Sequence, residues 1–410
     1  MTTAPTSRIQ APARAAQAGA GILLFVAVVA VGLQLRPAVA TVPPLLDVLR
    51  ERDGFGLTGA IVLTTLPVIC FGLTAALAPR VDRRWGAERG ITACLVLLAA
   101  GLLLRAAVPG VPALLAGTVL AAAAIGVVHV LLPALFKRRA PGSVAALTTA
   151  MSVTIGVGAA VSASLVIPLW HATSLPVALG VWAVVALAVV LLWLPQQRSV
   201  GTVVPVPSPL PVAGSLLRDR LAWQVTFYFG LQSVAYYALL SWLPTYFAER
   251  GLSRAVAGAS VAVLAVAGVA GSFAAKSLAA RLADQRGAVL VGGIAAPLGL
   301  LGVVLLPDGA ALGAVAVLGV GLGGALNTSL LLTTLRAADP GTAARLSGMA
   351  QTVGYVMAAA RPFAFGGLQG FTGNWAIALL ALGAVLVADA LAGLAAGRLG
   401  YVGGDTHPFC

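Results

Sequence analysis

Polar side chains that suit the binding of a small molecule stand inside several long apolar stretches of this sequence. Arg36 and Arg361 are cations in two such stretches, and Gln232, Tyr236 and Tyr237 lie close together in a third. A planar guanidinium can hold a nitro group, a carboxylate or another planar anion through two parallel hydrogen bonds. Phenol and amide groups with aromatic faces suit a flat heteroaromatic solute. These five residues are therefore candidates for contact with a solute.

Arg36 is informative because of its depth. In a helix that begins at Gly19 it lies roughly 25 Å along the axis, at about 1.5 Å per residue, in the outer third of a bilayer. An ionised side chain at the membrane midplane costs at least about 2.5 to 3.5 kcal/mol, so it needs a reason. One interpretation is an arginine that snorkels to the interface. The other interpretation is contact with a solute, since a cation at the outer end opposes the positive-inside bias described below.

Arg361 lies in a second apolar stretch that carries further candidates. At about 100° per residue, four residues of this stretch fall within roughly 80° of one another on a helix: Ser347, Gln351, Ala358 and Arg361. Tyr355, in the same stretch, is also a candidate for the binding site. Arg361 serves either a solute or a structural pair with Asp389 or a carbonyl, and both interpretations stay open.

The stretch near residues 222–247 has a polar stripe, which lipid would reject. Its members recur every four residues: Gln224, Tyr228, Gln232 and Tyr236. Tyr237 lies on the adjacent stripe, whereas Trp242 and Tyr246 fit an interfacial aromatic belt better.

Four other polar residues within apolar stretches have two interpretations each. His129 is a candidate ligand donor or proton carrier, or else a packing residue. Asn327 either binds solute or joins two helices by a hydrogen bond. For Asp389 we favour a structural partner over a coupling-proton site. Arg105 is expected to snorkel to the outer interface.

Several classes of function find no support in the sequence. It has no Ser-His-Asp arrangement, Walker loop, HExxH pair or CxxC pair, so we expect no enzyme, no metal site and no cofactor. The net charge of +13 comes without a basic stripe or a nucleic-acid-binding motif, so we expect no nucleic-acid partner.

Composition and hydrophobic pattern indicate the elements that position these residues. With 60% hydrophobic and 9% charged side chains, the 410 residues cannot cover a water-soluble globule of this size. Runs long enough to cross a hydrocarbon core of about 30 Å occur near 19–40, 57–79, 90–107, 112–136, 143–170, 175–194, 222–247, 255–279, 288–306, 311–335, 345–371 and 375–396. The sequence therefore predicts an all-α membrane protein with twelve transmembrane helices in two six-helix bundles.

An internal repeat and a proline-rich stretch divide the chain into two halves. Pro141 and Gly142 recur as Pro340 and Gly341, each pair at the start of a fifth helix, where Ser143 or Thr342 could form the N-cap. Six helices per half give both halves the same orientation. The expected divisions are a tail at 1–18, a bundle at 19–194, a linker at 195–221, a bundle at 222–396 and a tail at 397–410.

Basic residues set the orientation. With the amino terminus inside, the inner segments hold 18 of the 25 Lys and Arg residues and the outer loops hold 4. This positive-inside bias predicts that both termini and the linker lie in the cytoplasm. The membrane that the chain is expected to span is the inner (plasma) membrane.

Two loops resemble a signature of a known family. Arg80-Val-Asp82-Arg83-Arg84-Trp-Gly86-Ala-Glu-Arg89 resembles the loop signature of the major facilitator superfamily, and Arg281-Leu-Ala-Asp284-Gln-Arg286-Gly287 is similar to its degenerate second copy. The resemblance implies that Asp82, Arg83, Arg89 and Asp284 latch one face of a carrier closed. The alternative is that these charges serve only as topology signals.

Longer strings resemble the cyanate and 2-nitroimidazole porter branch of that superfamily. They are Leu63-Thr-Thr-Leu-Pro67, Leu221-Ala-Trp-Gln-Val225, Trp242-Leu-Pro244, Leu346-Ser-Gly-Met-Ala-Gln-Thr-Val-Gly-Tyr355 and Gly373-Asn-Trp375. The resemblance implies a monomeric secondary transporter that moves a small planar, anionic or strongly dipolar solute by alternating access, with a proton as candidate coupling ion. The alternatives are an efflux carrier of the same fold and, less favoured, a membrane sensor without transport.

Overall fold

The computed structural model describes residues 10–198, 216–360, 365, 367–373 and 375–403, and every regular element within these ranges is helical. The first half of the chain forms α1 (Gln10–Gln34), α2 (Pro37–Ala40), α3 (Leu46–Asp53), α4 (Leu57–Ala75), α5 (Ala78–Trp85), α6 (Ala87–Ala107), α7 (Val111–Arg139), α8 (Val144–Ala172) and α9 (Leu175–Arg198). The second half forms α10 (Arg220–Glu249), α11 (Arg254–Arg281), α12 (Arg286–Leu305), α13 (Ala311–Leu335), α14 (Pro340–Ala359), α15 (Gly367–Thr372) and α16 (Trp375–Ala396).

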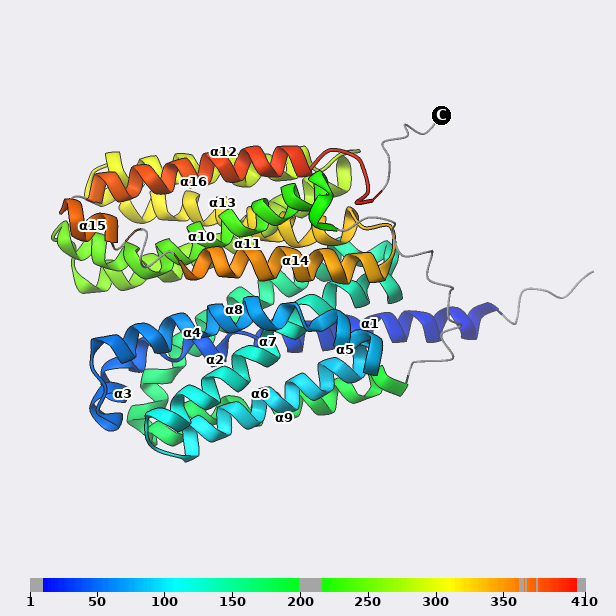
Figure 1. Cartoon of the computed structure of the whole chain (residues 1–410), viewed down its shortest axis with the longest axis horizontal. Coiled ribbons are helices and arrows are strands. Elements are labelled where there is room, and N and C mark those ends of the chain that lie inside the picture. The colour runs from blue at the N-terminus through cyan, green and yellow to red at the C-terminus, as the bar shows by residue number, and fades with distance from the viewer. Residues whose placement is uncertain (1–9, 199–215, 361–364, 366, 374, 404–410) are drawn as a thin grey trace, which may run out of the picture.

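The helices form two bundles that lie side by side (Figure 1). Helices α1 to α9 make one bundle and α10 to α16 make the other. The bundles meet where α4, α7 and α8 pack against α11, α13 and α14. Helix α1 begins and α16 ends at one end of the molecule, called here the α5 end, whereas α3 and α15 lie at the opposite α3 end.

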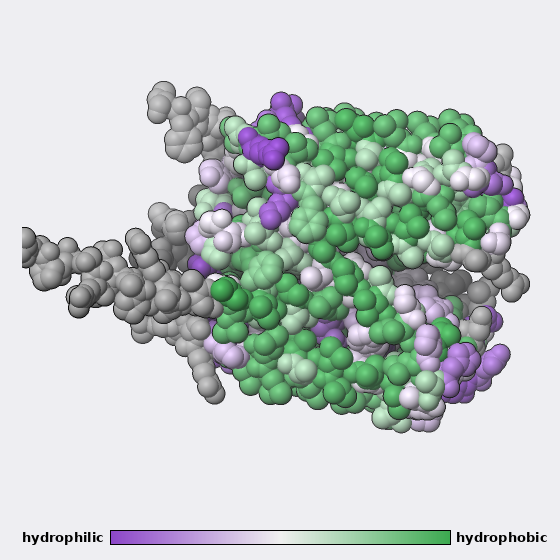
Figure 2. Space-filling model, turned by 180° about the vertical axis from the view of Figure 1, so that it is seen from behind, coloured by the Kyte–Doolittle hydropathy of each residue, from purple (hydrophilic) through white to green (hydrophobic). Residues whose placement is uncertain are grey.

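Length and hydropathy suit these bundles to a bilayer. Nine helices of the described chain are long and apolar enough to cross a membrane, and the bent pair Val62–Ala75 and Ala78–Trp85, with an angle of 51°, makes a tenth. Helices α10 and α14, of 30 and 20 residues, are long enough as well but carry more polar residues, and with them the described chain has the twelve long helices predicted. Figure 2 shows a face whose middle is hydrophobic and whose hydrophilic residues gather toward both ends. The predicted all-α membrane fold is confirmed.

The start of α14 corrects one prediction about helix capping. The cap is Asp339, whose Oδ1 accepts from the backbone N of Thr342 at 2.9 Å, while the Thr342 hydroxyl donates to Oδ2 at 2.6 Å. Burial raises the pKa of Asp339, but the hydrogen bonds from Thr342 and Gly341 outweigh it, so this pKa lies below its ordinary value. Ser143, the other predicted cap, makes no capping hydrogen bond.

The first membrane span is broken beside Arg36. Helix α1 ends at Gln34, and the four-residue α2 starts at Pro37, with Arg36 as its N-cap residue. Pro37 fits the first helical position, because the missing N–H would have no partner in the helix there. Arg36 therefore lies between the end of α1 and the start of α2.

Candidate functional site

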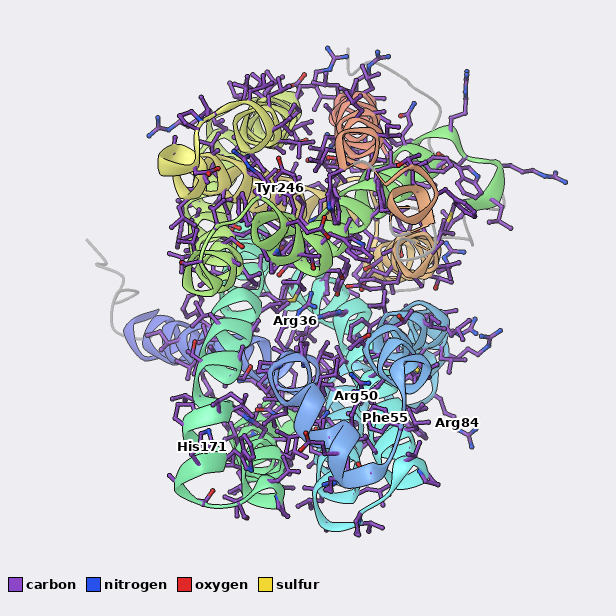
Figure 3. All side chains as sticks on the ribbon, turned by 90° about the vertical axis from the view of Figure 1, so that its left-hand side faces the viewer. Arg36, Arg50, Phe55, Arg84, His171 and Tyr246 are labelled. Atoms are coloured by element: carbon purple, nitrogen blue, oxygen red, sulfur yellow. The ribbon has the colours of Figure 1, made fainter. Side chains whose placement is uncertain are left out.

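Arg36 lies between the two bundles. Figure 3, which views the molecule from the α3 end, places it in the space between the upper and lower halves. Its Nη1 donates to the hydroxyl of Tyr237 at 2.7 Å, and its guanidinium carbon lies 5.6 Å from the centre of the Tyr237 ring. The residue is 9% exposed, and no ion pair within the described residues includes it. A buried cation is therefore held across the bundle interface by a phenol, without an acid partner in the part of the chain that the structure describes.

A cavity opens beside Arg36. It contains about 520 Å³ of empty space, part of which is continuous with the surroundings. Arg36 and Tyr236 line it together with small residues of α8, α11 and α13: Ser152, Gly156, Gly268, Ser272, Gly319 and Gly323. The Tyr236 ring stands nearly perpendicular to that of Tyr237, with centroids 5.4 Å apart. Gly319 and Gly323 let α13 approach α11 closely at this wall, since a Cβ at Gly319 would lie 2.5 Å from the carbonyl of Leu264 and one at Gly323 would meet the carbonyl of Gly268.

A second cluster, of aromatic rings around His129, joins the same bundles. The Tyr355 hydroxyl lies 3.3 Å from Nδ1 of His129, and the two rings stack with centroids 6.4 Å apart. Phe71 of α4 and Phe229 of α10 meet Tyr355 edge-on, each at 5.4 Å between centroids. Residues of α4, α7, α10 and α14 thus enclose one imidazole, which is 3% exposed.

Several polar atoms near this cluster have unused hydrogen-bonding capacity. Gln351 donates from Nε2 to the carbonyl of His129 at 3.1 Å and to Oγ of Ser347 at 2.9 Å. Its Oε1, the Nε2 of His129 and the Oδ1 of Asn327 are buried and have no partner among the described residues. Buried polar atoms are usually paired, so these three are suited to meet water or a solute.

The remaining predicted site residues lie as follows. Gln232 is 1% exposed, and its Oε1 accepts from the hydroxyl of the adjacent Ser233 at 3.3 Å. Asn327 is 1% exposed within α13. Arg361 lies outside the described residues. The structure thus brings Arg36, Tyr236 and Tyr237 together at the cavity and gathers His129, Gln351 and Tyr355 into the second cluster.

Comparison with known proteins identifies the family. A family model described as Major Facilitator Superfamily matches residues 18–362. The chain belongs to the major facilitator superfamily.

Two members of the superfamily are similar to the chain along most of its length. The 2-nitroimidazole transporter of Escherichia coli (strain K12) is 34% identical over 383 residues, which covers 92% of this chain and 96% of the relative. The cyanate transport protein CynX of the same organism is 28% identical over 356 residues, which covers 86% and 91%. The predicted resemblance to this branch of the superfamily is confirmed, and the chain is a membrane transporter of a small molecule.

The fold of the superfamily is also found in solved structures. The proton:xylose symporter XylE, solved with 6-bromo-6-deoxy-D-glucose, matches with a TM-score of 0.72 and 13% identity, covering 92% of this chain and 94% of that one. At this identity the likeness concerns the fold alone.

In the loop signature of the superfamily, the ion pair of Asp82 lies within one bundle. Asp82 accepts from Nη2 of Arg138 at 3.0 Å, which ties α5 to the end of α7. Arg83 and Arg89 are exposed. In the second copy, Asp284 accepts from the backbone N of Arg286 at 3.3 Å, at the start of α12.

A lysine that the sequence did not single out joins the two bundles at the α5 end. Nζ of Lys137, near the end of α7, donates to the carbonyl of Thr334 at 2.8 Å and to that of Ala337. Both carbonyls lie at the end of α13, where a helix terminus favours a cation. Nearby, a Cβ at Gly348 of α14 would lie 3.4 Å from the carbonyl of Ala75, so α14 and α4 are also close here.

Arg105 does not snorkel as predicted. It is 0% exposed, and its guanidinium donates to the carbonyl of Ala38 at 2.5 Å and to Oγ1 of Thr41 at 3.2 Å. The prediction was wrong because the hydrophobic pattern indicates only how deep a residue lies in the membrane. It does not show which neighbouring segments its side chain contacts.

Proposed function

We propose that this transporter moves a small planar solute, anionic or strongly dipolar, such as a nitroimidazole or cyanate, across the inner membrane. The observation that carries the proposal is the guanidinium of Arg36 at the wall of the cavity between the bundles. It has no acid partner in the described chain, and only its Nη1 makes a hydrogen bond there. The remaining donors are available to a solute. The names of the two relatives, a 2-nitroimidazole transporter and a cyanate transport protein, point to the same chemistry.

An anion or strong dipole suits this site for an electrostatic reason. A buried cation without an acid has lost its hydration and gains most from a partner that brings negative charge. Two parallel hydrogen bonds from the guanidinium select a planar group. Tyr236 adds a ring face and a hydroxyl at the cavity wall, and the Tyr237 ring stands against it, which favours a flat solute over a bulky one.

The transport cycle we propose is alternating access by two bundles, 19–194 and 222–396, joined by a linker at 195–221. Both termini lie in the cytoplasm, so the α5 end is the inner one. Lys137 ties the bundles there, and this supports an outward-facing state for the present conformation. Asp82, Arg83, Arg89 and Asp284 act in switching between states, with a proton as the coupling ion and a monomer as the working unit.

Transport by proteoliposomes tests the proposal. Purified wild-type protein is expected to exchange labelled 2-nitroimidazole or cyanate across the vesicle membrane, and Arg36→Ala is expected to abolish the exchange. Arg398→Ala, which removes an exposed arginine in the segment after α16, is the matched control and should keep full exchange. Full exchange by Arg36→Ala would overturn the role of Arg36, and no exchange of either compound by the wild type would overturn the solute class.

A further inference from the structure

A buried arginine on α6 contacts the short helix that follows Arg36. The guanidinium of Arg105 donates from Nη1 to the carbonyl of Ala38 and from Nη2 to Oγ1 of Thr41, at 2.5 and 3.2 Å. The Thr41 hydroxyl in turn donates to the carbonyl of Pro37 at 2.8 Å. One side chain thus holds both ends of α2, whose N-cap residue is Arg36.

Helix α2 is short and is held by its neighbours: it packs against α7 and α8, and its Ala38 lies in the buried core. It has four residues, and the backbone nitrogens of Val39 and Ala40 donate to the carbonyl of Arg36 at 3.0 and 2.9 Å. So short a helix is not stable by itself, because nucleation is unfavourable. The direction of α2 therefore depends on contacts from outside, and the backbone of Arg36 moves with it.

The platform behind Arg105 is rigid. Helices α6 and α7 cross with glycine against glycine: a Cβ at Gly101 would lie 2.6 Å from the carbonyl of Gly117, and a Cβ at Gly117 would lie 2.9 Å from the Cβ of Arg105. The two backbones are in direct contact at this point, so Arg105 starts from a fixed position.

Arg105 is a buried cation, and no acid in the described chain compensates its charge. Within the described chain it is in no ion pair, and its Nε has no hydrogen-bond partner. An unpaired buried cation is costly, and both of its acceptors belong to the segment that carries Arg36. A membrane protein keeps such a residue for a function more readily than for stability.

We propose that Arg105 is a positioning residue for the solute site: by holding α2 through Ala38 and Thr41, it sets the place of the Arg36 guanidinium beside Tyr237. This inference rests on the proposed function of Arg36. Arg105 itself does not line the cavity, so its effect on a solute passes through α2.

The first test needs no solute. In purified protein we expect Tyr237→Phe, which removes the acceptor of Arg36, to lower the melting temperature much less when Arg105→Met is already present. Arg105 donates to Ala38 and Thr41, whereas Tyr237 accepts from Arg36, so a non-additive effect of the two substitutions would show that Arg105 sets the position of Arg36. The control cycle combines Arg105→Met with Tyr246→Phe, farther along α10, and should be additive. Additive effects of Arg105→Met and Tyr237→Phe would overturn the proposal, even if the solute class in the proposed function were wrong.

The second test uses binding and transport of 2-nitroimidazole and cyanate. Thr41→Val removes one acceptor of Arg105 and should raise KM about tenfold with kcat little changed, as expected for one hydrogen bond from a charged donor. Thr41→Ser should restore the wild-type KM. Thr226→Val removes a buried threonine hydroxyl that bonds to the carbonyl of Ala222 at 2.7 Å, and serves as the control with normal KM. An unchanged KM in Thr41→Val, or an equal rise in Thr226→Val, would contradict the proposal.

Discussion

Replacing Arg36 with methionine should separate binding from stability, because the two respond in opposite directions. The folded protein would lose one hydrogen bond from a charged donor, about 1.5 to 3 kcal/mol, and a cation–π contact of about 1 kcal/mol. It would also be relieved of a desolvated charge that costs several kcal/mol and has no acid partner in the described chain. The free energy of unfolding should therefore stay the same or rise. Binding of an anion should weaken about 100-fold, because a bidentate charged pair worth about 3 kcal/mol is lost.

The assay measures both quantities on one preparation. Thermal unfolding in detergent gives the melting temperature, and the shift caused by 2-nitroimidazole or cyanate gives binding. Arg336→Met is the matched control, since Arg336 is 4% exposed and donates to the carbonyls of Ala396 and Gly397, each at 2.9 Å. This variant should lower the melting temperature, because it leaves those carbonyls without their donor. A fall of several degrees in Arg36→Met, similar to that of Arg336→Met, would refute the reasoning and give Arg36 a structural role.

Three further variants test other contacts. Lys137→Met should open the α5 end, because the hydrogen bonds to Thr334 and Ala337 are lost. Labelling of a cysteine placed between the bundles at this end should rise severalfold, with Lys137→Arg as the control, and unchanged labelling would contradict the role of Lys137. Asp339→Ala should lower the free energy of unfolding by about 0.5 to 2 kcal/mol. Because the pKa of Asp339 is lowered, its carboxylate contributes its full stabilisation above the ordinary pKa, and this stabilisation is lost as the pH falls through the lowered value. The difference in melting temperature between the wild type and Asp339→Ala should therefore become smaller in acid, and a difference that stays the same would contradict this. Gln351→Leu removes the unpaired Oε1 and two hydrogen bonds, so it should change stability little and weaken solute binding about tenfold; unchanged binding would exclude Gln351 from the site.

The sequence was sufficient for the helices because membrane spans have a strong signal in length and hydropathy. The predicted runs at 311–335 and 375–396 match α13 and α16 to the residue. The run predicted at 19–40 ends with α2 at Ala40, but α1 begins earlier, at Gln10, and the prediction missed the break at Arg36, for which Pro37 was the one local sign. Proline is tolerated in membrane helices, so its presence alone does not predict a break.

Contacts between helices were harder to predict, since their partners are often backbone atoms. Lys137 looked like a topology signal, yet its acceptors are carbonyls of α13, 197 and 200 residues away in sequence. A carbonyl is present at every residue, so no residue type marks it as a partner. The pairing of Arg36 with Tyr237 was easier to anticipate, because both side chains stood out as polar residues in apolar stretches.

The use of hydrogen-bond donors distinguishes the buried arginines of this chain. Arg105 and Arg336 direct their guanidinium groups at carbonyls next to helix ends, Ala38 for the first, Ala396 and Gly397 for the second. Arg36 donates to one phenol only, among the residues described, and the rest of its guanidinium borders the cavity. Burial alone would rank Arg105 first, since it is the least exposed. A solute needs a cation whose donors are free, however, so among the three buried arginines of the described chain we propose Arg36 as the one that binds it, whereas the two others hold the backbone in place.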